Sequence, residues 1–446
     1  MRIILRWFAV ILAIGLLWAR TARADDSLSI LRDAEIESII RTYATPLWTA
    51  AGLDPEAVHV YIVNDPQLNS FVAGGQNLFM NSGTILRSDS PNQLVGIMAH
   101  ETGHIEGGHL ARSEEAMRHA MIQSIIGLIA AAGAAVGGHG DAGAAVLEGS
   151  QDIAQREYFS FSIAQEATAD NAGLRLLDKT CQSAAGLLRF FRILEQEELL
   201  SAAHQDPYLR THPLTEQRVN TMAEHVRTAR CSNAKDPPEW IELHARMKAK
   251  LRAFLDPPAD TLAAYKSDDH SVAARYARAI AHYRQPDLGK ALPEIDALIH
   301  DYPKDPYFQE LKGQMLFENG RIAESLPPYE QSVKLKPDNA LLRVELAHAE
   351  LETNDKALLP KALAQLNDSV RFEGDNPDIW YFLSIAYGRS GNIGMAALSL
   401  AEQNIVNGDY TEARQQAARA LQLLPPGVAK QRALDIQAEA KRKGKP

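Results

Sequence analysis

The chain has 446 residues, of which 46% are hydrophobic and 23% are charged, and its formal net charge at pH 7 is −10. A hydrophobic chain of this length is expected to fold into two or three globular domains. The acidic balance excludes a general nucleic-acid binder, because no excess of basic side chains is present to neutralise phosphates.

The first 24 residues have the pattern of an export signal. Arg2 and Arg6 supply the positive start, residues 7–18 are continuously apolar, and residues 22–24 (Ala-Arg-Ala) match a cleavage site. The apolar run is shorter than the about 20 residues that a membrane-spanning helix needs. We expect residues 1–24 to be cleaved and the mature chain to be exported, with an uncleaved anchor as the alternative.

Three short segments have the composition of β-strands. Residues 58–63 are rich in β-branched and aromatic side chains, and residues 69–73 and 77–81 flank a Gly-Gly pair that is typical of a hairpin turn. A hairpin of this kind can take an extended peptide as an added strand along its free edge. The alternative is a hairpin that only packs against a neighbouring helix.

An apolar run at residues 94–99 leads into the motif His100-Glu101-Thr102-Gly103-His104. Residues four apart lie on one helix face, so the two imidazoles can reach one ion at about 2.0–2.1 Å. Glu101 lies one step round the helix, where its carboxylate can meet a metal-bound water without replacing it. This is the arrangement of a zinc peptidase, with two histidine ligands and a general base. The alternative is an ordinary amphipathic helix with two hydrogen-bonded histidines.

Two further features follow this motif. We expect Glu106 to be solvated and His109 to lie beside a ligand or at the surface, because the two histidines of the motif already fill the local geometry. Residues 121–136 are apolar and rich in Gly and Ala, but they are short for a membrane-spanning helix. We expect them to form a hairpin over the site or a surface in peripheral contact with a membrane.

A third metal ligand is expected on a second helix. Glu166 and Asp170 lie one helical turn apart, on the same face. Glu166 would complete a His2Glu site that keeps an open position for water. Asp170 can accept the second ring N–H of a ligating histidine and so fix its tautomer. The alternative is a solvated acidic face.

His212 and Arg218 are the last two candidate site residues. Because His212 precedes a proline, we expect it on an extended segment that leads into a helix. Arg218 falls on that helix and can reach a carboxylate or a developing oxyanion.

Cys181 and Cys231 are the only cysteines of the sequence. Since the chain is expected to be exported, the two can form one disulfide, which would stabilise the fold by about 2–4 kcal/mol. Two buried free thiols are the alternative.

The C-terminal half has the pattern of a helical repeat protein. Residues 256–260 (Asp-Pro-Pro-Ala-Asp) resemble a linker, and Pro303 and Pro337 lie 34 positions apart, at the tetratricopeptide period. Repeat units are expected at about residues 272–303, 305–338 and 340–370, and from residues 376 and 408 onwards. Stacked units of this kind form a curved array that binds peptides or proteins.

The sequence thus predicts a mainly α fold with a small β-hairpin or sheet. We expect a protease domain at residues 25–255, followed by a repeat domain at residues 256–446 that forms an α-solenoid. A purely structural helical tail is the alternative for the second domain.

Three motifs resemble those of the gluzincin metallopeptidases related to the CAAX prenyl protease, Oma and HtpX: His100-Glu101-x-x-His104, Glu166-x-x-x-Asp170, and Thr211-His212-Pro213 with Arg218. The resemblance implies one zinc ion per chain, held by the two histidines of the first motif and the glutamate of the second, with Glu101 as the general base. It also implies that His212 can fill the fourth zinc position in a resting state. Relatives commonly carry Ser-Arg ahead of the ligand glutamate, whereas this chain has Ser162-Ile163, so an arginine contact to that helix is expected to be missing.

The export signal and the repeats are similar to those of the soluble periplasmic branch of this family. This resemblance implies a periplasmic endopeptidase, associated with the outer membrane, that degrades outer-membrane β-barrel proteins stalled during assembly and also assists their assembly. It implies that the repeats dock on the β-barrel assembly machinery. A non-catalytic repeat scaffold or chaperone with a structural zinc ion is the alternative from another functional class.

Overall fold

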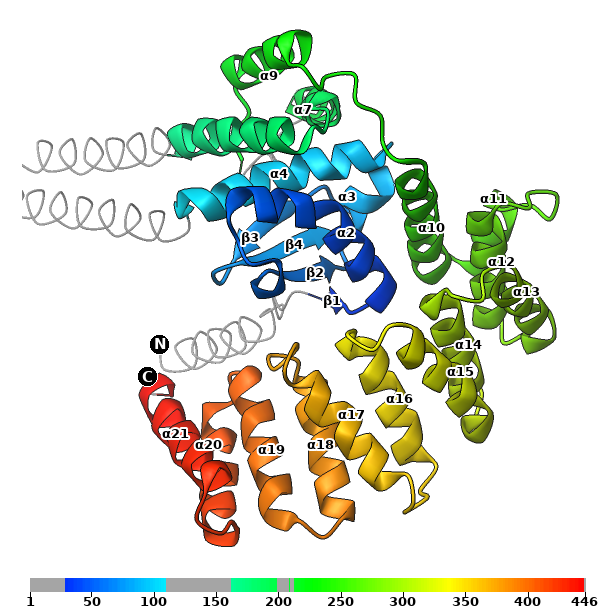
Figure 1. Ribbon diagram of the computed structural model, residues 1–446, viewed down its shortest axis with the longest axis vertical. Coiled ribbons are helices and arrows are strands. Elements are labelled where there is room, and N and C mark those ends of the chain that lie inside the picture. The colour runs from blue at the N-terminus through cyan, green and yellow to red at the C-terminus, as the bar shows by residue number, and fades with distance from the viewer. Residues whose placement is uncertain (1–28, 110–161, 199–207, 209–211, 445–446) are drawn as a thin grey trace, which may run out of the picture.

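The computed structural model describes residues 29–109, 162–198, 208 and 212–444 (Figure 1). The predicted export signal and the apolar segment 121–136 lie outside these residues. The described chain is mainly helical, with one small sheet near its N-terminus and paired helices in its C-terminal half, which confirms the predicted fold class. Among the helices that can be described, none is both long and apolar enough to span a membrane.

The sheet has four strands in the order β1-β2-β4-β3. Their bounds are Ile30–Leu31 for β1, His59–Val63 for β2, Ser70–Ala73 for β3 and Asn77–Asn81 for β4. The antiparallel pair β3–β4 is the predicted hairpin, and β4 also runs parallel to β2. Because β4 lies between β2 and β3, β3 is an edge strand of the described sheet.

The two faces of the sheet differ. Alternate residues of β2, β3 and β4 point into the core, and the other face carries four ring side chains that stack in sequence across the strands: His59, Tyr61, Phe79 and Phe71. Neighbouring rings lie 4.9–6.5 Å apart between centroids. An aromatic stripe therefore crosses the sheet and ends on the edge strand.

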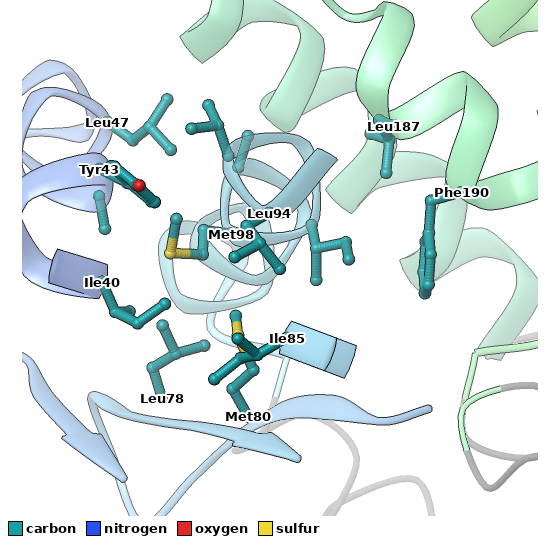
Figure 2. Close-up of a cluster of buried hydrophobic side chains, with 14 of the residues drawn as sticks. Ile40, Tyr43, Leu47, Leu78, Met80, Ile85, Leu94, Met98, Leu187 and Phe190 are labelled. Atoms are coloured by element: carbon teal, nitrogen blue, oxygen red, sulfur yellow. The ribbon is translucent and has the colours of Figure 1, made fainter. Parts of the chain in front are cut away.

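Helix α4 (Pro91–Gly107) runs through the middle of the N-terminal domain, between α2 (Ala34–Ala51), α3 (Ser82–Arg87) and the sheet on one side and α7 (Ala185–Glu198) on the other. Figure 2 shows its Leu94 and Met98 within a cluster of buried side chains from these elements. Pro91 begins α4 at a position where its missing N–H costs nothing, and Gly108 ends it in the left-handed conformation that glycine favours. The helix that bears the histidine motif is thus buried along most of its length.

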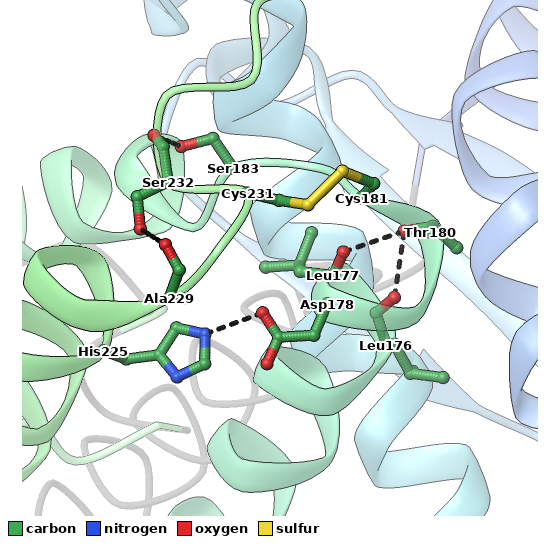
Figure 3. Close-up of a disulfide and its surroundings, with 10 residues drawn as sticks. All are labelled: Leu176, Leu177, Asp178, Thr180, Cys181, Ser183, His225, Ala229, Cys231 and Ser232. Atoms are coloured by element: carbon green, nitrogen blue, oxygen red, sulfur yellow. Dashed lines mark hydrogen bonds and ion pairs between the residues drawn. A yellow bond between two sulfur atoms is a disulfide. The ribbon is translucent and has the colours of Figure 1, made fainter.

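A second long helix, residues 162–180, packs against α4 and is followed by α7 and by α9 (Glu216–Thr228). Cys181 and Cys231 form a disulfide, shown in Figure 3, which confirms the predicted bond. The bridge joins the end of helix 162–180 to the segment that follows α9.

Helix α10 (Pro238–Leu255) connects the two halves of the molecule. Its Met247 and Leu251 belong to the core around α4, whereas Ala249 and Ala253 pack with the first repeat helices. The linker expected at residues 256–260 is shorter in the structure, because residues 258–260 already belong to α11 (Pro258–Ala264) and only Asp256 and Pro257 separate it from α10. Helix α10 therefore packs in both cores.

The C-terminal half consists of successive helix pairs that curve around the sheet (Figure 1). The pairs are α12 and α13 (Val272–Arg284, Leu288–Asp301), α14 and α15 (Pro306–Glu318, Ile322–Leu335), α16 and α17 (Ala340–Glu352, Leu359–Ser369), α18 and α19 (Pro377–Arg389, Ile393–Val406), and α20 and α21 (Tyr410–Leu423, Val428–Lys443). These pairs confirm the predicted repeat units.

Charged contacts attach this array to the N-terminal domain. The buried Glu35 of α2 accepts from Tyr276 at 2.8 Å and pairs with Lys250 at 3.2 Å. On the far side of the curve, Arg32 pairs with Glu373 at 2.8 Å. A cavity of about 530 Å³ lies between these attachments, lined by α2, β2 and the repeat loops.

Candidate metal centre

His100 and His104 lie one turn apart on α4 and point to the same place. Both are buried, and their Nε2 atoms lie 3.1 Å from each other. Two nitrogen ligands of one tetrahedral zinc ion, each about 2.05 Å from it, would be about 3.3 Å apart. The spacing of the two imidazoles therefore already suits a shared ion.

Helix 162–180 brings Glu166 to the same point. Its carboxylate oxygens lie 3.2 Å from Nε2 of His104 and 3.4 Å from Nε2 of His100. The two helices can approach this closely because Gly103 faces Ala169, whose carbonyl oxygen would lie only 2.5 Å from a Cβ at that position. The glycine within the histidine motif thus permits the close packing that joins the two parts of the site.

Asp170, one turn after Glu166, contacts the other nitrogen of His100. Its Oδ1 lies 2.9 Å from Nδ1, the contact that the sequence predicts. A proton on Nδ1 donates to this carboxylate and leaves the lone pair of Nε2 directed at the cluster. Burial alone would lower the pKa of His100, but the hydrogen bonds to Asp170 and Glu166 outweigh it and raise the pKa to about 10.

Arg218 on α9 holds both carboxylates. Its guanidinium donates to Asp170 at 2.6 and 2.9 Å, lies 3.1 Å from Glu166 and donates to the carbonyl of Pro213 at 2.7 Å. These contacts occupy the guanidinium, so the carboxylate contact foreseen for Arg218 is present and an oxyanion role does not fit. The arginine contact expected to be missing beside Ile163 is supplied here from another helix, and Ile163 itself is 41% exposed.

Glu101 lies beside the cluster without joining it. Its side chain is 1% exposed, and its carboxylate oxygens have no hydrogen-bond partner within the described ranges. Burial raises the pKa of this carboxyl to about 8. A divalent cation at the cluster would lower that pKa again and would offset the cost of burying the charge.

His212 lies beside Glu101 and the two histidines of the motif. Its Nε2 lies 3.7 Å from Oε1 of Glu101, and its ring stacks on Tyr208 with centroids 4.3 Å apart. Burial lowers the pKa of His212 to about 3, which keeps the imidazole neutral and able to act as a ligand. The sequence pattern does not single out Tyr208, although it lies only four positions before His212.

His109 and Glu106 have the surroundings that we expect from the sequence. His109 is buried beside the cluster, with its Nδ1 3.0 Å from Nδ1 of His104. Glu106 is exposed and pairs with Arg175 at 2.6 Å. Neither contributes a ligand atom to the cluster.

Four side chains fit a metal ion. One ligand atom from each lies within 4.8 Å of all the others in the set His100, His104, Glu166 and His212. Imidazole nitrogens with a carboxylate oxygen are a donor set that zinc accepts, and thiolates are absent from this set. A cation within the cluster explains why the Nε2 atoms face each other. It also explains why the carboxylate of Glu101, which has no hydrogen-bond partner among the described residues, is buried beside them.

Comparison with known proteins gives the following relationships. Residues 31–226 match the model of peptidase family M48, and residues 260–306 and 276–340 match a tetratricopeptide repeat model. Beta-barrel assembly-enhancing protease from Yersinia pestis is 22% identical over 420 residues, which cover 90% of this chain and 82% of that protein. Putative beta-barrel assembly-enhancing protease from Vibrio cholerae is 26% identical over 389 residues, covering 85% and 78%. Metalloendopeptidase OMA1, mitochondrial, from Danio rerio is 25% identical over 233 residues, covering 51% and 45%.

Proposed function

Since residues 31–226 form a metalloprotease domain of peptidase family M48, we propose that this chain is a periplasmic zinc endopeptidase that degrades misassembled outer-membrane proteins. The observation that carries the proposal is the buried four-residue cluster with the buried carboxylate of Glu101 beside it, for which the described residues offer no hydrogen-bond partner. The names of the relatives from Yersinia pestis and Vibrio cholerae support the substrate class.

We assign the ligand role to His100, His104 and Glu166, which would hold one zinc ion per chain. When bound, the ion supplies a Lewis acid that polarises the scissile carbonyl and makes water a stronger nucleophile near neutral pH. Asp170 orients His100, and Arg218 fixes Asp170 and Glu166, so both act by positioning the ligands.

Glu101 acts as the general base. It takes a proton from the attacking water and later returns it to the nitrogen of the leaving amine. Its buried position excludes bulk solvent, so the proton stays with the reacting groups. Glu101 also argues against the alternative of a scaffold with a structural zinc ion, since such a site needs no base.

His212 is the proposed gate of the resting enzyme. Its position within the cluster is consistent with a fourth ligand that must move aside before water and substrate can enter. After such a move the imidazole would remain close enough to stabilise a developing oxyanion.

The edge strand β3 offers a place for the substrate. Its outer edge is unpaired within the described sheet, and an extended polypeptide could add to it as a further strand. On one face the added strand would meet Phe71, the last ring of the aromatic stripe, so aromatic or β-branched side chains would be favoured there. Strands of outer-membrane barrels that failed to pair supply such segments.

The proposed division of the chain is an export signal at residues 1–24, the protease domain at 25–255 and the repeat domain at 256–446. The repeats would recruit clients and dock on the β-barrel assembly machinery, in line with their match to tetratricopeptide repeats. A chaperone-like role in barrel assembly would use the same array.

Chelation tests the proposal. We expect the purified chain to digest an unfolded outer-membrane β-barrel protein, to lose this activity after a zinc chelator, and to regain it with zinc but not with magnesium, since magnesium prefers oxygen ligands. Digestion is followed on gels, with casein as a general substrate. Digestion that persists in the chelated protein, or no digestion by either the zinc-loaded wild type or zinc-loaded His212→Ala, in which the proposed gate is removed, would rule the proposal out.

A further inference from the structure

The helices that carry Glu166 and Arg218 are joined at a second place, far from the cluster. His225 near the end of α9 contacts Asp178 at 3.1 Å, and Cys231 beyond α9 is bonded to Cys181 at the end of helix 162–180 (Figure 3). Ser183 also donates to the carbonyl of Ser232 at 2.6 Å. The pair Asp178–His225 and the bridge Cys181–Cys231 are called the clamp below.

The clamp and the metal site both depend on how far α9 is shifted along helix 162–180. Along one helix the contacts fall at residues 170 and 178, and along α9 at residues 218 and 225, so the two helices run parallel. At about 1.5 Å per residue, these steps are about 12 and 10 Å along the two axes. Because the steps nearly match, one register of α9 places Arg218 on Asp170 and His225 on Asp178 together.

The contacts of Arg218 leave little room for movement. Its donors reach Asp170 at 2.6 and 2.9 Å and Glu166 at 3.1 Å. Sliding α9 by one helical turn, about 5.4 Å, would lengthen these contacts beyond hydrogen-bond range. Asp170 would then be free to turn away from His100, and Glu166 from the cluster.

The backbone conformation at Cys181 is unusual for a residue other than glycine, and the disulfide accounts for the cysteine at this position. Cys181 has φ 51°, in the left-handed region at the end of a helix where glycine is favoured. A cysteine at this position has an unfavourable backbone conformation. Its side chain is exposed, and its sulfur is bonded to Cys231.

We propose that Asp178, His225 and the Cys181–Cys231 bridge are positioning residues for the metal centre, which hold α9 in the register that lets Arg218 fix the ligand Glu166 and the ligand-orienting Asp170. The inference rests on the proposed function, because it takes these residues as the metal site. It adds that metal retention depends on contacts that lie at least three helical turns from the ligand Glu166 along helix 162–180.

The test measures the rate at which the zinc-loaded full chain loses its metal to a chelator. Three variants are compared: His225→Gln, the double variant Cys181→Ser/Cys231→Ser, and Arg227→Gln as the control. Arg227 lies on the same turn of α9 as His225, but among the described residues it pairs only with Glu224 of its own helix. We expect the first two to release zinc about tenfold faster, the low end of the loss seen when outer partners of metal ligands are removed, and the control to match the wild type.

A second readout separates register from simple loss of stability. The cobalt-substituted protein should show an altered visible absorption in His225→Gln, because the ligand geometry changes, while its unfolding temperature stays near that of Arg227→Gln. If the double variant does not fold, wild-type protein reduced with a water-soluble phosphine replaces it, because a dithiol would itself bind zinc. The phosphine gives two electrons to the bridge, water supplies the two protons, and the phosphine leaves as its oxide with the oxygen of that water.

Unchanged zinc release and an unchanged cobalt spectrum in the clamp variants would overturn the inference. If the wild type meanwhile binds zinc and digests protein, the proposed function stands without it. A wild type that binds no zinc would overturn both.

Discussion

Replacing Glu101 with Gln is expected to reduce proteolysis by about 10²–10⁴-fold, the contribution of a positioned general base. The carboxylate is buried next to the cluster and lies 3.7 Å from His212, but it offers no atom to the metal set. Glutamine has the same shape and cannot accept the proton of the attacking water. Zinc content, measured by atomic absorption, should therefore stay at one per chain while the rate of digestion falls.

Glu106→Gln is the matched control, because Glu106 lies on the same helix and its carboxylate pairs with Arg175 at the surface, the one ion pair it makes with a described residue. It should leave both zinc content and digestion unchanged. If Glu101→Gln kept its proteolytic rate, Glu101 would not be the base. If it kept the maturation of a client while losing digestion, scaffolding would be the main activity.

Replacing Arg218 with Gln is expected to lower the free energy of unfolding by about 3–5 kcal/mol, as when one partner of a buried ion pair is removed. The guanidinium is 3% exposed and is the cation that contacts both Asp170 and Glu166. Without it two buried carboxylates repel each other, and the hydrogen bond of Asp170 to His100 weakens. Urea unfolding of the metal-free chain measures the first effect, and a zinc titration measures an affinity loss of about 10–100-fold.

Arg218→Lys is the comparison variant. It keeps the charge but loses the planar fork that donates to both oxygens of Asp170, so it should fall between the wild type and Arg218→Gln. Equal stability and zinc affinity in all three proteins would show that Arg218 does not support the site. An activity loss in Arg218→Gln with unchanged zinc affinity would instead favour a direct part in the reaction.

Local patterns account for what could be predicted from the sequence. His100 and His104 follow from helix periodicity, the β3–β4 hairpin from its Gly-Gly turn, and the repeat helices from a regular proline spacing. Each of these depends on residues close together in the chain, where propensity and spacing act directly.

Contacts between distant segments could not be predicted in this way. The parallel pairing of β2 with β4 depends on how α2 and the hairpin pack, and the Arg32–Glu373 pair joins residues 341 positions apart. A sequence motif covers only residues that are close in the chain, so it predicts an arginine contact to the helix of Glu166 only from position 163, where this chain has Ile163. The structure provides the same contact from α9, which only the folded arrangement reveals.

X-ray absorption at the zinc edge of the purified resting protein tests most directly whether α4 and helix 162–180 together hold a catalytic ion. We predict one zinc per chain with nitrogen and oxygen neighbours at about 2.0–2.2 Å, and a scattering pattern of three imidazoles in the wild type that falls to two in His212→Ala. Absence of zinc, or sulfur neighbours at about 2.3 Å, would contradict the account.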